Sequence, residues 1–577
     1  MSKKANYDNW SKEELIKELK RIKETKYGLV WHRDKETEEK LDILINLDAK
    51  TPSETFSNEV SGKPFPVLKE VKGKQILTNK NKLFNLLIEG DNYHALAVLN
   101  FTHQEAVDLI YIDPPYNTGS SDFIYNDKIV DLEDPFRHSK WLSFMEKRLK
   151  LAKNLLRKNG VIFISIDDNE QAQLKLLCDE IFGPNNFIAN LVWRKKRGYG
   201  RGNSLFILQT EYILCYAKDI SEVQEFKQSI SEHKLEAYKY KDNFGFYKRE
   251  GLDHHSPRGA YERKTLQYDL VIDGKKIYCP TGQWLWSKDR VGEELKNFSN
   301  NGKLKEYKYL EIVKDTQGRW RAYKKIRLDD ESGEVRGEKP LSLIDDSRFT
   351  TNYSASEIND IFGEPIFNYS KPTNLIKYLI NFSSDKNAVI LDFFAGSGTT
   401  GQAVLSLNDE DRGNRKFILC TNDENKICNN VCYPRIEKII NGYKNPKNKE
   451  VKGLGGNLKY FTAYDFVEAK ETDQNKRKLV NKSTEMLCIK ENAFELIQDE
   501  DDFKIFKNSD HYLGVIFYEE AIDDYKKAIK KINGHFNTYV FSLGDDPHER
   551  QFSDVKNKVS LCAIPEVILK VYREIFK

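Results

Sequence analysis

Four consecutive residues in the first quarter of the chain could grip a flat amine. Asp113-Pro114-Pro115-Tyr116 follows directly on the apolar run Val107–Ile112. The two prolines fix the backbone and remove two N–H donors, while their carbonyls remain acceptors. The tetrapeptide therefore offers a carboxylate and a rigid carbonyl as a pair of acceptors, with an aromatic ring beside them. We predict that Asp113, Pro114, Pro115 and Tyr116 are catalytic.

This pair of acceptors suits methyl transfer to the exocyclic amine of a nucleobase. The lone pair of adenine N6 is delocalised into the ring, so the amine is a poor nucleophile. Asp113 and the Pro114 carbonyl could hold its two hydrogens and favour a nitrogen whose lone pair points outward. Extruding the base from a duplex costs a few kcal/mol, and stacking on Tyr116 could return about 1–3 kcal/mol. An ordinary Pro-Pro turn after a strand is the alternative.

A second loop, far downstream, has the features of a cofactor site. Residues 393–398, Phe-Phe-Ala-Gly-Ser-Gly, follow the apolar run Val389–Asp392 and precede a predicted helix. Gly396 and Gly398 allow a tight turn and close approach of a ligand, and the helix start near Thr399 offers N–H groups to a carboxylate or phosphate. The stretch lacks the third glycine of a dinucleotide fingerprint and the lysine of a P-loop. A purely structural turn is the alternative.

The elements that position both loops alternate between buried strands and helices. We expect strands at 84–91, 107–112, 161–166, 389–392 and 416–420, and helices at 93–99, 140–158, 171–181 and 399–407. This alternation predicts a doubly wound α/β sheet, whose ligands bind at the carboxyl ends of its strands. Residues 187–367 lack the alternation and are predicted to be an insertion that splits the sheet.

We therefore divide the chain into five segments. They are an N-terminal helical arm (1–70), the first part of the α/β domain (71–186), the insertion (187–367), the second part of the α/β domain (368–445) and a C-terminal domain (446–577). The arm opens with a capping-box pattern at Ser11 and an amphipathic helix through Leu15, Leu19 and Ile22. A lysine- and asparagine-rich stretch from about 443 resembles a linker.

Composition fits a protein with sizeable cores but does not reveal its partner. The 577 residues are 39% hydrophobic and 31% charged, with a net charge of +3. No apolar run is long enough to cross a membrane and no secretory signal is evident, so we expect a cytoplasmic protein. The eight cysteines are scattered without a CxxC pair or a matching histidine cluster, so we expect no metal site.

Positive charge is concentrated at the start of the insertion. Residues 194–290 hold 19 Lys and Arg against 13 Asp and Glu, an excess of six. The densest patch interleaves basic groups with Trp193 and Tyr199, a combination that suits a phosphate backbone and unstacked bases. We predict a DNA-binding patch there, with a solvated loop as the alternative. Its basic members are Arg194, Lys195, Lys196, Arg197 and Arg201.

Together these stretches resemble the Mod subunit of type III restriction-modification systems. Mod subunits are DNA adenine-N6 methyltransferases of the β arrangement, in which the catalytic loop precedes the AdoMet loop. The resemblance covers roughly residues 20–440. It rests on residues 26–31 (KYGLVW), 88–92 (IEGDN), 113–119 (DPPYNTG), 163–170 (FISIDDNE), 211–214 (EYIL), 394–400 (FAGSGTT) and 413–418 (GNRKFI).

The resemblance implies a fold and a set of site residues. The fold is a Rossmann-like AdoMet-dependent methyltransferase sheet, interrupted by a target-recognition insertion and followed by a C-terminal α+β domain. Asp91 would lie near the cofactor's adenine, and Lys371 beside its methionine end. Asp423 or Glu424 would bind the ribose, a choice left open. The remaining cofactor residues implied are Asp392, Phe394, Ala395, Gly396, Ser397, Gly398, Thr399 and Thr400.

The implied partners are S-adenosyl-L-methionine, double-stranded DNA, a second copy of the chain in a homodimer, and a Res helicase-nuclease subunit. Two alternatives remain. Cytosine-N4 methyltransferases share this chemistry but more often carry serine where Asp113 stands. A non-catalytic DNA-recognition subunit for a partner nuclease would have a vestigial pocket, against which the intact loops argue.

Overall fold

The computed structural model of the chain separates into two compact units. It describes residues 11–12 and 64–575, apart from 80–81, 120–123, 126–127, 130–133, 135, 199–204, 229, 231, 256–260, 302–303, 330–334, 336, 368, 469–471, 509 and 545. The larger unit comprises Met1–Gln224 and Leu341–Lys577, and the inserted unit comprises Glu225–Pro340. Beyond residues 11–12 and 64–70, the predicted N-terminal arm lies outside the described residues.

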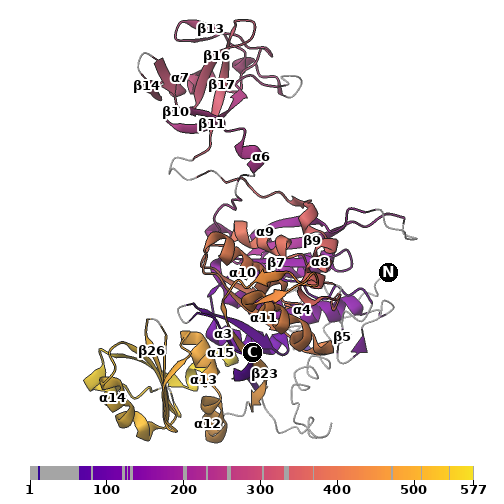
Figure 1. The fold of residues 1–577 in the computed structure, drawn as a ribbon. Coiled ribbons are helices and arrows are strands. Elements are labelled where there is room, and N and C mark those ends of the chain that lie inside the picture. Colours follow the sequence, from indigo (N-terminus) through magenta and orange to yellow (C-terminus); the bar gives the residue numbers. More distant parts are fainter. Residues whose placement is uncertain are drawn as a thin grey trace. The chain divides into compact units, whose positions relative to one another are not determined.

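The larger unit is built on one mixed sheet of eleven strands (Figure 1). Its path runs β1-β23-β3-β20-β19-β4-β7-β9-β8-β18, with β2 paired to β23. The strands are β1 (Phe65–Glu70), β2 (Ile76–Leu77), β3 (Phe84–Glu89), β4 (Val107–Ile112), β7 (Leu156–Ile166), β8 (Phe187–Arg194), β9 (Thr210–Ala217), β18 (Leu343–Ile344), β19 (Val389–Asp392), β20 (Lys416–Thr421) and β23 (Asn457–Val467).

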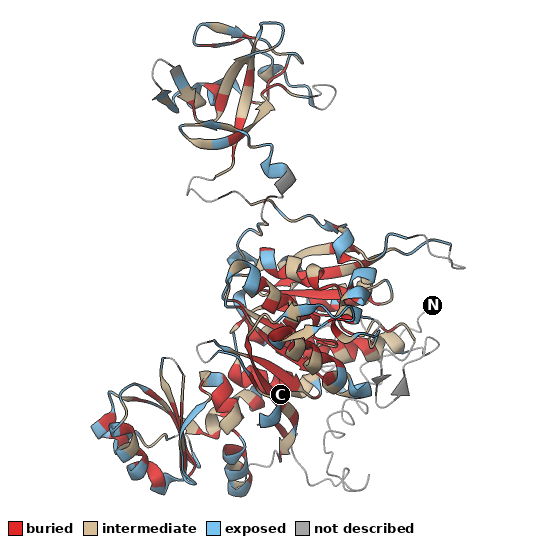
Figure 2. Cartoon of the chain, viewed as in Figure 1, coloured by how far each residue is buried: buried red, intermediate tan, exposed pale blue. Residues whose placement is uncertain are grey.

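The six strands from β23 to β7 are parallel, and helices cover both faces of this part of the sheet. In one layer of helices, α3 packs against α4 and α4 packs against α5. In the other layer, α9 packs against α10 and α10 packs against α11. The strand side chains between the layers are almost entirely buried (Figure 2). The helices are α3 (Asn92–Thr102), α4 (Arg137–Leu155), α5 (Gln171–Phe182), α8 (Thr351–Phe362), α9 (Thr373–Ser383), α10 (Thr399–Asp411) and α11 (Tyr433–Asn441).

The predicted α/β class is confirmed, and the structure divides the chain at different points from those we expected. β8 and β9 fall inside the expected insertion 187–367, yet they extend the main sheet because β9 pairs antiparallel with β7. The inserted unit therefore starts at Glu225. The expected linker near 443 is a short hairpin of β21 (Gly442–Lys444) and β22 (Glu450–Lys452).

The expected C-terminal segment 446–577 also contributes to the main sheet, since β23 lies between β1 and β3. The rest of it forms a separate five-stranded sheet with four helices that packs against α3, and Tyr572 donates to the Pro66 carbonyl. These elements are α12 (Asp473–Asn481), α13 (Thr484–Glu491), β24 (Glu495–Asp499), β25 (Phe503–Lys507), β26 (Tyr512–Ile516), α14 (Ile522–Lys530), β27 (Phe536–Phe541), β28 (Val559–Ile564) and α15 (Glu566–Ile575).

The inserted unit is a small β-rich body with its own apolar core. Its central sheet has the order β10-β11-β17-β13-β12, with β16 paired to β17. The elements are α6 (Glu232–Leu235), β10 (Tyr240–Asp242), β11 (Gly245–Gly251), β12 (Leu270–Ile272), β13 (Lys275–Ile277), α7 (Lys288–Glu294), β14 (Phe298–Asn301), β15 (Leu304–Tyr307), β16 (Leu310–Lys314) and β17 (Trp320–Arg327). In the described part of the chain, no helix is long and apolar enough to cross a membrane.

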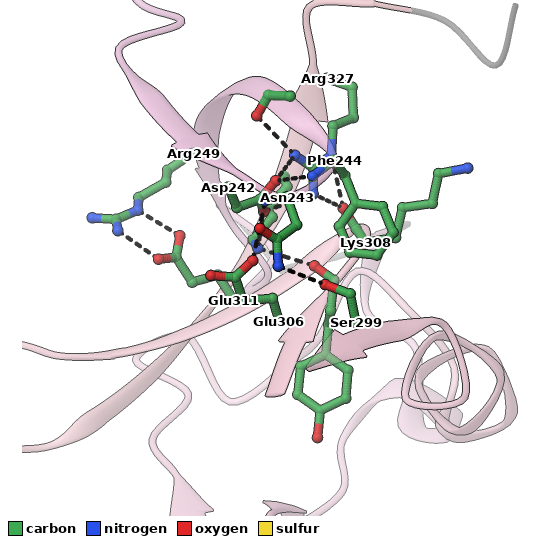
Figure 3. Close-up of polar contacts among 12 residues, drawn as sticks. Asp242, Asn243, Phe244, Arg249, Ser299, Glu306, Lys308, Glu311 and Arg327 are labelled. Atoms are coloured by element: carbon green, nitrogen blue, oxygen red, sulfur yellow. Dashed lines mark hydrogen bonds and ion pairs between the residues drawn. The ribbon is translucent and has the colours of Figure 1, made fainter. Parts of the chain in front are cut away.

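A buried ion triad ties the strands of the inserted unit together. Asp242 contacts Arg327 and Lys325, and all three side chains are at most 5% exposed. Arg327 also donates to the Lys308 carbonyl, which links the sheet to the chain beyond β15 (Figure 3). Burial raises the pKa of Asp242, but its hydrogen bonds to Arg327 and Lys325 lower that pKa by more. The carboxylate therefore stays charged between its two cations.

We predict that Asp242→Ala destabilises the inserted unit by about 3–5 kcal/mol, because it leaves two buried cations without their anion. Amide hydrogen exchange of β10, β11 and β17 in the full chain measures this loss. The control is Asp269→Ala, which removes an exposed pair with Lys276 and should cost about 0–1 kcal/mol. Equal protection in the two variants would contradict the role given to the triad.

Candidate active site

The Asp-Pro-Pro-Tyr loop is held at the carboxyl edge of the sheet by contacts on both sides. The Pro115 carbonyl accepts from Trp141 Nε1 at 2.7 Å, so one of the two proline carbonyls serves the protein itself. After Tyr116 the backbone enters the left-handed region at Asn117, whose φ is 57° and whose side chain is fully buried. Asn117 Nδ2 donates to Glu170 Oε1 at 2.5 Å. These contacts therefore fix the conformation of the loop within the folded chain.

Asp113 faces a lysine that lies 258 residues away in the sequence. Lys371 Nζ donates to both carboxylate oxygens of Asp113 at 2.7 Å and lies 3.9 Å from Glu211 Oε2. We expected Lys371 beside a cofactor's methionine end, whereas here its ammonium contacts the predicted catalytic carboxylate. Burial lowers the pKa of Lys371, but Asp113 and Glu211 raise it by more, so the amine is held in its charged form.

Glu211 joins this pair to the basic patch. Its Oε2 accepts from the Tyr116 hydroxyl at 3.0 Å, and its Oε1 accepts from Lys195 Nζ at 2.8 Å. Burial raises the pKa of Asp113, and the negative charge of Glu211 raises it further, while Lys371 opposes both. Sequence reasoning gave Glu211 no role in the site, although it begins the stretch Glu211-Tyr212-Ile213-Leu214 that carries part of the family resemblance.

The glycine loop is organised around Asp392, the last residue of β19. Its carboxylate accepts from the Phe394 N–H at 3.0 Å and from the Thr400 hydroxyl at 2.5 Å, so it bridges the loop to the first turn of α10. Burial raises the pKa of Asp392 to about 7, against the opposing effect of these hydrogen bonds. Gly396 and Gly398 both have positive φ, 50° and 79°. Asp392 thus positions the turn.

Behind the glycine loop lies a fully buried arginine that sequence reasoning missed. Arg435 Nη1 donates to the hydroxyls of Ser370, Ser397 and Thr399 at 2.9–3.1 Å. Its other side-chain hydrogen bonds go to the uncharged Gln402 and Thr373. Burial lowers the pKa of Arg435 to about 10, and the negative charge of the nearby Glu357 opposes this effect. A guanidinium is costly to bury without a hydrogen-bonded anion. The hydroxyls and the guanidinium of this cluster are groups that could hold a carboxylate or another anion.

The sequence around Arg435 gives a weak indication that this residue is buried. Cys432, Ile436, Ile439 and Ile440 are buried on one face of the helix, and a position three residues after Cys432 falls on that face. An arginine on the apolar face of a short amphipathic helix marks a group with a partner inside the protein. Nothing in the spacing says which partner.

Two further acidic candidates follow neighbouring parallel strands, β3 and β20. Asp91 caps α3, is half-exposed and contacts Arg148 at 3.2 Å. Asp423 has a side chain 11% exposed and accepts from the Asn429 N–H at 3.0 Å, whereas Glu424 is exposed. The ring of Phe394 packs against the ring of Phe144 on α4. The Ala395 N–H donates to the Cys420 carbonyl at 3.1 Å.

The basic patch lies at the root of the β8–β9 connection. Arg194 and Arg197 share Asp345, at 3.3 and 2.7 Å, and Lys195 pairs with Glu211. Lys196 is exposed, and Arg201 lies outside the described residues. The patch therefore adjoins the Asp113 loop, and three of its cations already have carboxylate partners.

Comparison with known proteins places these features in a family. Residues 107–432 match the family described as DNA methylase, of the N6 and N4 type. The type III restriction-modification enzyme StyLTI Mod subunit of Salmonella typhimurium is 34% identical over 65% of this chain and 58% of that protein. The EcoPI Mod subunit of Escherichia phage P1 is 34% identical over 67% of this chain and 66% of its own length.

The chain thus spans about three fifths of the first of these relatives. Among solved structures, the M1.HpyAVI–SAM complex aligns with 61% of this chain and 97% of its own, at 14% identity and a TM-score of 0.29.

We predict that Gly398→Ala destabilises the larger unit more than Gly396→Ala. Both substitutions place a side chain at positive φ, which costs about 1–2 kcal/mol each. A Cβ at position 398 would also lie 3.1 Å from Cys432 Sγ, whereas at position 396 the nearest atom is 3.8 Å away. Thermal unfolding of the two variants measures the difference. Equal losses of stability would mean that the contact with Cys432 is relieved without cost.

Proposed function

Because this chain belongs to the DNA methylase family, we propose that it transfers a methyl group from S-adenosyl-L-methionine to N6 of an extruded adenine in duplex DNA. One observation carries the proposal. β4 and β19 are adjacent parallel strands, in register at Leu109 with Ile390 and Ile110 with Leu391. The loops that begin at Asp113 and Phe393 therefore open at the same edge of the sheet, where open α/β sheets bind ligands.

The residues around the glycine loop fit the methyl donor. Bound AdoMet supplies an electrophilic methyl group on a sulfonium. The turn at Gly396 and Gly398 lets the backbone approach a ligand, and the Arg435 cluster suits the carboxylate of the methionine end. Phe394 lines the pocket, with Asp91 nearer the adenine. We assign the ribose hydroxyls to Asp423, since Glu424 is exposed.

The target amine would be held by Asp113 and the Pro114 carbonyl, each accepting one hydrogen. This leaves the nitrogen lone pair directed outward, an electrostatic preorganisation of the reacting atom. Tyr116 would stack on the extruded base while its hydroxyl stays on Glu211. Lys371 must release at least one Asp113 oxygen, and Glu211, 3.9 Å away, is the acceptor to which its ammonium can turn. Asp113 then accepts the proton that the methylated nitrogen sheds.

We further propose that the chain is the modification and recognition subunit of a type III restriction-modification system. The Mod subunits to which it is similar support this role. It would act in the cytoplasm on double-stranded DNA as a homodimer, and with a Res helicase-nuclease subunit for cleavage. The inserted unit 225–340 would read the target sequence. Cytosine-N4 methylation remains the competing chemistry, and a non-catalytic recognition subunit the competing role.

We predict that Asp113→Ala lowers the rate of methyl transfer by about 10²–10³-fold or more, because the amine loses an acceptor that must be in place in the transition state. Transfer of labelled methyl from AdoMet to duplex DNA measures the rate, and nucleoside analysis identifies the base. DNA affinity in a gel-shift assay should change little.

The matched control is Asp219→Ala. It removes an acidic residue that follows the end of β9, whereas the site lies at the start of that strand, so this variant should retain activity. Label in cytosine or in protein would refute the adenine assignment. Loss of DNA affinity in Asp113→Ala would show that Asp113 has a structural role.

We predict that Arg435→Gln weakens AdoMet binding by about tenfold or more, since a charge-assisted contact to the carboxylate is lost. Isothermal titration measures the affinity for AdoMet and for its decarboxylated analogue, and only the former should fall. The control is Arg415→Gln, a buried arginine paired with Asp411, which should lower stability without discriminating between the two ligands. Equal weakening of both ligands by Arg435→Gln would contradict the assignment.

A further inference from the structure

The connection between β8 and β9 carries an apolar run on the surface. Leu205, Phe206, Ile207 and Leu208 are 97%, 78%, 49% and 64% exposed. No other run of four consecutive large apolar side chains is exposed among the residues that the structure describes. Such a run is unfavourable in water unless a partner covers it.

The connection that carries the run starts at the edge of the sheet where Asp113 lies. Arg194 pairs with Thr210, and Trp193 with Glu211, where β8 and β9 meet, and Tyr212 pairs with Ile166 at the carboxyl end of β7. β7 is parallel to β4, so the β8–β9 connection leaves the sheet at the same edge as Asp113. The hydrogen bond from Tyr116 to Glu211 joins the root of the connection to the catalytic loop directly.

The reach of the chain allows this run to enter a DNA groove while Glu211 stays in the site. Leu208 and Leu205 precede Glu211 by three and six residues, which span at most about 10 and 20 Å at roughly 3.3–3.6 Å per residue. A major groove is about 8.5 Å deep and a minor groove about 7.5 Å. A tip that starts beside the extruded base can therefore reach the base-pair stack that the base has left.

The charge at the root of the connection favours a polyanion as the partner. Arg194, Lys195, Lys196 and Arg197 supply four positive charges, and their partners Asp345 and Glu211 supply two negative ones, which leaves +2. Lys196 is exposed, and Arg194 and Arg197 share a single carboxylate. Cations at the root of an apolar loop are suited to hold phosphates beside an inserted wedge.

We propose that Leu205, Phe206, Ile207 and Leu208 form a wedge that enters the DNA duplex beside the target base and occupies the space left when the base is extruded. This inference rests on the proposed function. The apolar side chains stack against the neighbouring base pairs, where unstacked base faces replace water around them. Their contact with DNA lowers the cost of extrusion and leaves the chemistry at Asp113 unchanged.

The test compares Leu205→Ser/Phe206→Ser with a matched control, Leu496→Ser/Ile497→Ser. The control pair is also consecutive and exposed, at 44% and 42%, but lies on β24 of the C-terminal sheet. Two duplexes carry the recognition sequence, established first by mapping modified bases in DNA treated with the wild-type chain. In one duplex the target base is paired, and in the other it faces an abasic site, so that extrusion is already easy.

We expect kcat/KM of the wedge variant to fall at least about tenfold on the paired duplex, and by no more than about threefold on the duplex with the abasic site. The fluorescence increase of 2-aminopurine at the target position should fall in parallel, while AdoMet binding and the activity of the control variant stay at wild-type values. Rescue by the abasic site is specific to a role in extrusion.

Three results would overturn the inference. Equal loss on both duplexes, or no loss on either, would show that the run does not assist extrusion. A variant that changes only its sedimentation coefficient would show that the run is a surface between protein chains. Failure of the proposed function is a separate outcome, because DNA treated with the wild-type chain would then carry no modified base at the mapping step.

Discussion

The site depends on keeping several carboxylates close together at one edge of the sheet. Asp113, Glu211 and Asp392 are all largely buried there, and like charges at short range raise the free energy of the ionised state. Lys371 supplies the positive charge that makes this arrangement stable, since it contacts Asp113 and lies near Glu211. In the proposed mechanism the lysine is also the group that an incoming amine must displace from Asp113. The same side chain would therefore stabilise the carboxylates and compete with the substrate.

The site joins two parts of the sheet that lie far apart in the sequence. Asp113 directly follows β4 and Lys371 precedes α9, and their ion pair joins the two parts of the sheet that meet where β19 pairs with β4. The inserted unit occupies the intervening chain without entering the sheet, because its strands pair only among themselves. Both strands that meet at the site are therefore needed before either loop has its partner. The site is therefore complete only when the two parts of the sheet have paired.

Local sequence was sufficient to predict the edge of the sheet and the two loops on it, because an apolar run ending in a polar turn is a short-range pattern. It did not reveal β8, β9 and β23 as sheet members, since their pairing is non-local and their buried faces resemble those of any amphipathic strand. Asp113 and Lys371 were both singled out, but not as partners. Arg435 was missed because a buried charge is recognised only by what surrounds it.

Two features of the larger unit break the ordinary rule for where side chains lie. Arg435 is a buried charge whose Nη1 donates to three hydroxyls, and Leu205–Leu208 is an apolar surface exposed to water. Each is costly in water or in the protein interior, and in the proposals above each would be stabilised by a complementary ligand, a carboxylate in one case and unstacked base faces in the other. The two lie at the donor and the target side of Asp113. On these proposals, the binding of AdoMet and the binding of DNA would each stabilise the larger unit.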